Sequence, residues 1–111
     1  MDKLQNRIIE YKRVKASELV VNERNFREHP LNQKEALDGV LTVIGQADSL
    51  IAYYSKRNDG RLTLIDGHLR KDYDPEQQWN VQITDLTDEE ADLLISMLDP
   101  IAGMANMNAM K

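Results

Sequence analysis

The stretch Leu64-Ile65-Asp66-Gly67-His68-Leu69-Arg70-Lys71 (LIDGHLRK, residues 64–71) decides how the rest of the sequence is interpreted. A short apolar run, typical of a buried strand, stops at Asp66-Gly67, and the following residues favour a short helix. The first backbone N–H groups of such a helix have no carbonyl partners, and they attract anions. Gly67 lets backbone approach a ligand, His68 donates hydrogen bonds, and Arg70 offers a planar fork for phosphate oxygens. The simpler interpretation is a strand, a turn and a surface helix with an ordinary arginine.

Two β-rich segments precede this stretch and flank a turn. Residues 49–56 (SLIAYYSK) and 61–66 (RLTLID) are separated by residues 57–60 (RNDG), and the Asp-Gly pair there is a strong hairpin signal. Because side chains alternate across a strand, one of Tyr53 and Tyr54 is expected in the core and the other on the surface.

Two other segments have the start signals and apolar spacing of helices. Asn32 and Glu35 have capping-box form, and apolar residues at helical spacing follow up to Gly45, where the helix should end. Thr87 begins a second capping box, and Pro100 is expected to limit that helix. The expected buried stripes are Leu37, Val40, Leu41 and Ile44 in the first helix, and Ala91, Leu94, Ile95 and Leu98 in the second.

Two more strands and a turn complete the elements. Residues 8–15 (IIEYKRVK) form a first strand, and residues 79–86 (WNVQITDL) form another with alternating apolar residues. Residues 16–19 (ASEL) read as one helical turn capped by Ser17, and residues 20–30 as a loop. The side chains expected to face inward are Ile9, Tyr11 and Val14 in the first strand, and Trp79, Val81 and Ile83 in the other. About four strands interleave with three to four helices, which predicts a compact α+β domain around a small mixed four-stranded sheet.

Length and composition favour one domain over residues 1–111, because the chain is 41% hydrophobic and 30% charged. The absence of cysteine excludes disulfides, thiolate catalysis and cysteine-ligated zinc, and we expect neither zinc nor haem. No apolar run approaches the roughly 18 residues of a membrane span, and no secretory signal leads the chain, so a cytoplasmic protein is expected.

The net charge of −5 argues against strong DNA binding by this domain alone, since duplex binding usually needs a basic face. Residues 85–99 carry six acidic and no basic side chains: Asp85, Asp88, Glu89, Glu90, Asp92 and Asp99. The simplest interpretation of this run is a solvated helix face, and the alternative is a surface that binds a partner.

The order of several segments is distinctive. The chain reads NERNFR at 22–27, VIG at the end of a helix at 43–45, SLIAYY at 49–54, then a hairpin and LIDGHLR at 64–70. This order resembles the ParB/sulfiredoxin superfamily, and it is most similar to the small ParB-like domains of bacteria, phages and mobile elements. The resemblance runs over residues 14–104, which leaves residues 105–111 as a tail.

In that superfamily the box after the hairpin binds nucleotide phosphates. It reads Gly-Glu-Arg-Arg in ParB and Gly-Cys-His-Arg in sulfiredoxin, so Gly67 and Arg70 match both, while Leu69 replaces a polar or basic residue. Residues 45–51 correspond to the Gly-x-x-Gln-Pro-Ile segment of ParB, with Asp48-Ser49 in place of Gln-Pro. The phosphate-binding or nucleotide-binding residues that the resemblance implies are Gly67, His68, Arg70 and Arg27, with Asp66 beside them.

Departures from the family pattern limit the chemistry. Sulfiredoxin activity is excluded because its cysteine is absent. The ParB motif Glu-Asn-x-Gln-Arg should fall near residues 97–101, where the chain reads MLDPI, and Asp99 is the candidate ligand for Mg²⁺. Glu28 and Glu35 are candidate general bases if the site transfers phosphoryl groups.

These observations predict a ParB-like module that binds a nucleotide (CTP or ATP) with Mg²⁺, or another phosphate ligand. It would serve partition, modification or regulation of DNA through a DNA-binding or DNA-modifying partner protein, and a homodimer is compatible with this role. The chain is not expected to be a complete centromere-binding protein, because it ends before the helix-turn-helix segment of such proteins. Two alternatives stay open: a nucleotide-dependent phosphotransferase or nuclease, and a degenerate domain that only mediates protein contacts.

Overall fold

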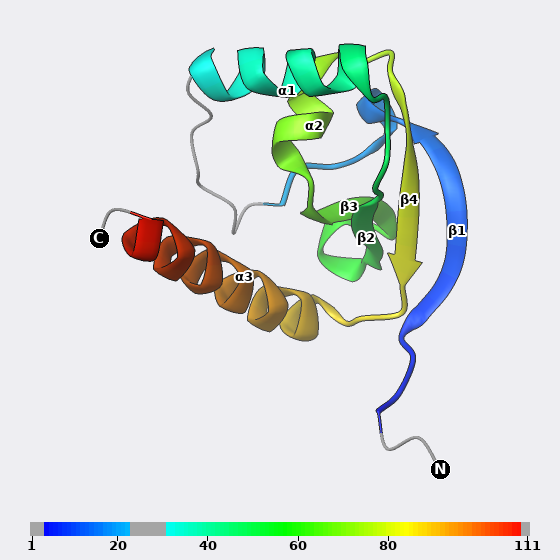
Figure 1. The fold of residues 1–111 in the computed structure, drawn as a ribbon. Coiled ribbons are helices and arrows are strands. Elements are labelled where there is room, and N and C mark those ends of the chain that lie inside the picture. The colour runs from blue at the N-terminus through cyan, green and yellow to red at the C-terminus, as the bar shows by residue number, and fades with distance from the viewer. Residues whose placement is uncertain (1–3, 23–30, 110–111) are drawn as a thin grey trace.

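The computed structural model describes residues 4–22 and 31–109, with side chains described for residues 4–22 and 33–98. Figure 1 shows four strands, three α-helices and two short 3-10 turns in these residues. The elements are β1 (Ile8–Lys15), η1 (Ala16–Glu18), α1 (Leu31–Val43), β2 (Leu50–Ser55), η2 (Lys56–Asn58), β3 (Arg61–Asp66), α2 (His68–Tyr73), β4 (Gln78–Thr84) and α3 (Asp88–Ala109).

The four strands form one sheet in the order β1-β4-β2-β3. β1 pairs with β4 and β2 with β3 in antiparallel fashion, whereas β2 and β4 run parallel. The sheet is therefore mixed, and the predicted α+β architecture is confirmed. The hairpin between β2 and β3 is also confirmed, because Asp59 and Gly60 both have positive φ angles and the Gly60 amide donates to the Ser55 carbonyl at 2.7 Å.

Each face of the sheet carries its own apolar cluster. The first cluster packs with Leu41 of α1 and consists of Val14, Ala16, Leu19, Leu50, Ala52, Leu64, Trp79, Val81 and Ile83. The second packs under α3 and consists of Tyr53, Ile65, Ala91 and Ile95, with Ile51, Leu86, Leu94 and Leu98 partly buried against it. The predicted inward residues of β4 and of α3 are therefore confirmed, and Tyr53 is the core tyrosine, since Tyr54 is 45% exposed.

The prediction that three side chains of β1 face inward was wrong in part. Val14 is buried as expected, but Ile9 is 58% exposed and Tyr11 is 72% exposed. β1 is an edge strand with a register shift between Ile8 and Glu10, and α3 contacts the β3 side of the sheet instead. An apolar side chain near that end of β1 is therefore not covered by a helix and stays exposed to solvent.

The stripe of α1 is also narrower than predicted. Leu37 and Leu41 are half-buried, whereas Val40 and Ile44 are 52% and 69% exposed. In Figure 1 α1 lies across α2 at one end of the sheet, and so only one ridge of it reaches the core. The helix ends as expected before Gly45, whose φ of +89° is left-handed.

The structure also differs from the sequence predictions at the cap of η1, at the end of β4 and at the end of α3. η1 has no side-chain cap, because Ser17 lies inside the turn and its amide donates to the Pro75 carbonyl at 2.9 Å. β4 ends at Thr84, two residues before the expected boundary. α3 continues through Pro100 to Ala109, so the expectation that Pro100 limits it was wrong. Proline inside a helix removes one backbone hydrogen bond and disfavours the helical conformation of the residue before it, but here it does not end the helix.

The capping box of α3 is confirmed, and it is joined to the N-terminal segment. The Thr87 amide donates to Glu90 Oε1 at 3.0 Å, and the Glu90 amide donates to Thr87 Oγ1 at 3.2 Å. Arg7 donates from Nη1 and Nη2 to the Glu90 carboxylate, both at 2.9 Å, and from Nε to Asp85 at 2.6 Å. The hydrogen bonds from Arg7 and the Thr87 amide lower the pKa of Glu90 to about 2.

A second set of contacts ties the start of α3 to β2. Asp88 Oδ1 accepts from Tyr53 Oη at 2.8 Å and from Ser55 Oγ at 2.5 Å, while Oδ2 accepts from the Arg57 amide at 3.1 Å. Arg57 also donates to both oxygens of Asp92. Four acids of the run thus form contacts within the protein and stay partly exposed, while Glu89 is exposed, so the run is only in part a solvated helix face.

Candidate functional site

Gly67 joins β3 to α2, and the structure requires a residue without a side chain there. Its φ is +111°, in the left-handed region that favours glycine. A Cβ atom built at this position would overlap Cδ2 of the buried Leu50 and lie 3.3 Å from Arg70 Nη2. The chain therefore turns tightly between the sheet and the guanidinium of Arg70.

The start of α2 leaves backbone donors without helical acceptors. The first intrahelical bond runs from the Lys71 amide to the Gly67 carbonyl at 3.0 Å, so the N–H groups of His68, Leu69 and Arg70 precede the helical ladder. α2 has only six residues, which makes its dipole small. Any anion at this turn would therefore depend mainly on Arg70.

The Arg70 side chain is 16% exposed and forms an ion pair with Asp48, whose side chain is 70% exposed. It borders a groove of about 410 Å³ between α1 and the start of α2. The lining residues are Gln33, Leu37, Asp48, Asp66, Gly67, His68, Leu69 and Arg70. A neighbouring hollow of about 210 Å³ shares Leu37, Asp48 and Arg70 with this groove and continues along α1. A largely buried cation thus sits beside an open, partly polar groove.

His68 lines the groove, and its ring is mostly buried. The residue is 6% exposed, and its Nε2 accepts a hydrogen bond from the Asn22 amide at 3.3 Å. A ring nitrogen that accepts carries no proton, so this face of the imidazole cannot donate to an anion.

The other predicted site residues are only partly gathered at this groove. Asp66 lines it together with Gly67 and Arg70. Glu35 is exposed on α1. Arg27 and Glu28 lie outside the described residues, and Asp99 lies in the part of α3 whose side chains are not described. Within the described residues no group of three or more His, Asp or Glu side chains is placed to hold a metal ion.

Asp48 is the residue of this site that sequence reasoning missed. The chain has an acid here where the ParB-like segment has glutamine, and the ion pair with Arg70 gives that departure a role. The signal available in the sequence was the opposite charge of two residues in segments that the resemblance brings together.

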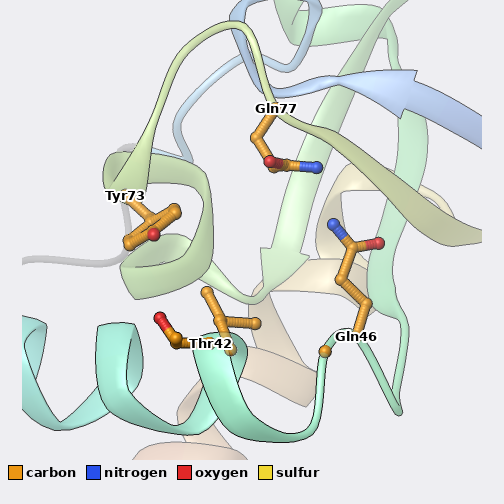
Figure 2. A pocket seen from close by; sticks show the side chains of 6 residues that line it. Thr42, Gln46, Tyr73 and Gln77 are labelled. Carbon is orange, nitrogen blue, oxygen red and sulfur yellow. The ribbon is translucent and has the colours of Figure 1, made fainter.

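A second, uncharged pocket lies at the far ends of the same two helices. Figure 2 shows Thr42, Gln46, Tyr73 and Gln77 around it, and its volume is about 250 Å³. Tyr73 Oη donates to Asp38 Oδ1 at 2.6 Å, which raises the pKa of Tyr73. Gln46 donates from Nε2 to the Gln78 carbonyl at 2.7 Å, and its buried Oε1 has no partner among the described residues. No sequence motif pointed to this pocket.

The chain matches no protein-family model, and a search of curated proteins finds no match. It is similar in structure to the C-terminally truncated chromosome-partitioning protein ParB from Caulobacter crescentus in complex with CTP-γ-S, with a TM-score of 0.65 and 13% identity, over 81% of this chain and 52% of that one. It is also similar to a Pnob8-like ParB-N domain, with a TM-score of 0.61 and 19% identity, over 86% of this chain and 39% of that one. The protein therefore has a ParB-like fold, and it spans about half of these chains or less. In the described residues no helix is both long and apolar enough to cross a membrane.

Proposed function

We propose that this protein is a ParB-like module that binds the phosphate groups of a nucleotide in the groove between α1 and the start of α2. The observation that carries the proposal is Arg70, whose guanidinium is largely buried against Gly67 and opens onto the groove. Guanidinium has five N–H donors in a fork that fits phosphate oxygens, and a single carboxylate partner cannot use all of them.

The carboxylates at the groove determine what kind of phosphate fits. Asp48 neutralises Arg70 in the absence of a ligand, and Asp66 adds a second negative charge. A polyphosphate there must compete with Asp48 or be accompanied by a cation, since like charges repel at short range. Mg²⁺ prefers carboxylate and phosphate oxygens and keeps several waters, so it fits this set of donors.

The fold likeness supports CTP as the first nucleotide to test, because one structure with this fold contains CTP-γ-S. The net charge of −5 argues against strong DNA binding by this chain alone, so we propose that it serves DNA transactions through a DNA-binding or DNA-modifying partner. Leu69 removes one polar contact from the phosphate box, so we expect affinity in the weaker part of the range for nucleotide sites.

The test is calorimetric titration with CTP, ATP, GTP and ADP, each with and without Mg²⁺. We expect saturable binding that is lost in Arg70→Ala and kept in Arg61→Ala, which removes an exposed arginine from β3. Asp48→Asn should strengthen nucleotide binding, because it removes the competing carboxylate from Arg70. Failure of every nucleotide to bind, or equal binding by Arg70→Ala, would refute the proposal. Turnover of the nucleotide or cleavage of DNA in the same samples would favour the phosphotransferase or nuclease alternative.

A further inference from the structure

The two edges of the sheet differ in how they are covered. At the β3 edge, Val20 forms a parallel bridge: its amide donates to the Leu62 carbonyl, and the Leu64 amide donates to the Val20 carbonyl, both at 2.9 Å. At the other edge lies β1, the longest strand of the sheet, and no described segment pairs with its outer side. Figure 1 shows β1 as a curved strand at the rim of the molecule.

The ladder with β4 determines which groups of β1 point outward. The Ala16 amide donates to the Gln77 carbonyl at 2.9 Å, and the register pairs Val14 with Trp79 and Lys12 with Val81. Because antiparallel hydrogen bonds repeat every second residue, Lys12 and Val14 bond to β4. The N–H and C=O groups of Tyr11, Arg13 and Lys15 therefore point away from the sheet.

This open edge has features that discourage most partners. Lys12, Arg13 and Lys15 place positive charge along it, and the register shift between Ile8 and Glu10 interrupts the strand. Lysines and bulges on edge strands are common devices against unwanted pairing. These features still allow pairing with a strand whose charges follow the complementary order.

A second copy of β1, running antiparallel, supplies that order in one register. When Tyr11 faces Tyr11 of the other copy, Glu10 lies opposite Lys12 twice, once on each side of the two-fold axis. Tyr11 then occupies a hydrogen-bonded position, and the Glu10–Lys12 pairs occupy the closer, non-hydrogen-bonded positions where side chains interact most strongly.

Antiparallel pairings of the two β1 strands in neighbouring registers are less favourable. A shift by two positions in one direction puts Lys12 opposite Lys12, and in the other direction it puts Glu10 opposite Glu10, and like charges directly opposite are destabilising. A shift by one position sets residues of opposite sheet faces against each other. The charge pattern of β1 therefore favours the self-pairing centred on Tyr11 over these neighbouring registers.

We propose that two copies of this protein associate through β1 with Tyr11 at the two-fold axis, so that two four-stranded sheets become one continuous sheet. The exposure of Tyr11, at 72%, leaves its ring free for an aromatic pair across the axis. The regular part of the ladder is short, so the dimer is expected to be weak and to form at high protein concentration.

Sedimentation equilibrium over a concentration series up to the millimolar range tests this arrangement. Glu10→Lys and Lys12→Glu should each weaken dimerisation roughly tenfold or more, because each replaces two attractive pairs by two repulsive ones. The double variant should regain dimerisation, and a mixture of the two single variants should form heterodimers. Lys34→Glu, the same charge change at an exposed site on α1, should leave the association unchanged.

Tyr11→Pro tests the backbone contact separately. Proline removes an N–H that faces solvent in the monomer, so the ladder to β4 is kept while the central hydrogen-bonded pair of the dimer is lost. We expect a folded monomer with a circular dichroism spectrum like that of the wild type. A wild-type protein that stays monomeric at every concentration, or a dimer insensitive to the charge series, would overturn the proposal. If Tyr11→Pro fails to fold, the charge series still decides it.

Discussion

Asp88 is the contact on which the junction between β2 and α3 depends, and Asp88→Ala tests this directly. The carboxylate accepts hydrogen bonds from Tyr53, Ser55 and the Arg57 amide. Burial alone would raise the pKa of Asp88, but these hydrogen bonds hold it below its usual value. The residue is thus expected to be ionised near neutral pH, when all three hydrogen bonds are assisted by its charge.

The size of the effect follows from the burial of the donors. Tyr53 is 1% exposed and Ser55 is fully buried, so Asp88→Ala leaves two buried hydroxyl groups without an acceptor. Each buried hydroxyl group without a hydrogen-bond partner lowers the free energy of unfolding by about 1–3 kcal/mol. The groove of about 640 Å³ beside Asp88 admits water that can satisfy part of this need. We therefore expect a loss of about 2–4 kcal/mol in the free energy of unfolding.

Urea denaturation followed by circular dichroism measures this loss, and Glu89→Ala is the matched control. Glu89 is an exposed acid in the same first turn, so its removal changes the charge and the dipole contribution alike but should cost no more than about 0.5 kcal/mol. Ser55→Ala should cost less in Asp88→Ala than in the wild type, because one of the two partners of its hydroxyl is then already gone. A residual cost is expected in both backgrounds, since the Asn58 amide donates to Ser55 Oγ at 3.2 Å. A loss for Asp88→Ala that does not exceed the Glu89→Ala control would refute the reasoning.

Three further outcomes are expected from the same structure. Gly67→Ala should lower the free energy of unfolding by about 2–4 kcal/mol, since it forces a left-handed φ on alanine and drives its Cβ into Leu50; thermal unfolding with full stability retained would contradict this. The pKa of Glu90 falls from 4.5 to about 2 in the folded state, so its stabilising contribution is present above pH 4.5 and is lost as the pH falls toward 2. Unfolding measured across this window should therefore depend less on pH in Glu90→Gln than in the wild type, and an unchanged slope would argue against the Arg7 contact. Added salt should weaken the same contact, because Arg7 and Glu90 are 32% and 43% exposed, and a salt-insensitive difference between wild type and Glu90→Gln would count against it.

Local sequence patterns predicted the helices and strands of the fold, but they predicted the packing of these elements only in part. The Asp-Gly turn and the alternation in β4 depend on neighbouring residues, and the structure agrees with both. The prediction that Tyr11 is buried was wrong because alternation identifies the two faces of a strand. It does not show which of these faces is covered by a helix. Pro100 was mistaken for a boundary because a proline signal is local, and α3 continues through it to Ala109. The described buried contacts of α3, from Ala91 to Leu98, all precede this proline.

In the candidate site, too, local features could be predicted from the sequence, whereas contacts between separate segments could not. Gly67 was identified from the change of strand to helix, and its positive φ agrees with that expectation. Asp48 was missed because its contact with Arg70 depends on how two separate segments meet. His68 was given a donor role because a motif states residue order without burial, and the ring instead accepts from the Asn22 amide. Local sequence therefore predicts turns well, and it predicts which way a side chain faces only when the neighbouring layer is known.

The pairing of β1 with β4 has a consequence for the order of events during synthesis. The register joins Ile8 to Thr84 and Lys15 to Gln78, so the earliest-made of these four strands pairs in the sheet with the latest-made of them. The β2–β3 hairpin can close within a few residues, but β1 must wait until β4 has emerged, and that long loop is costly to close. β1 therefore stays without its partner strand while residues 16–77 are synthesised.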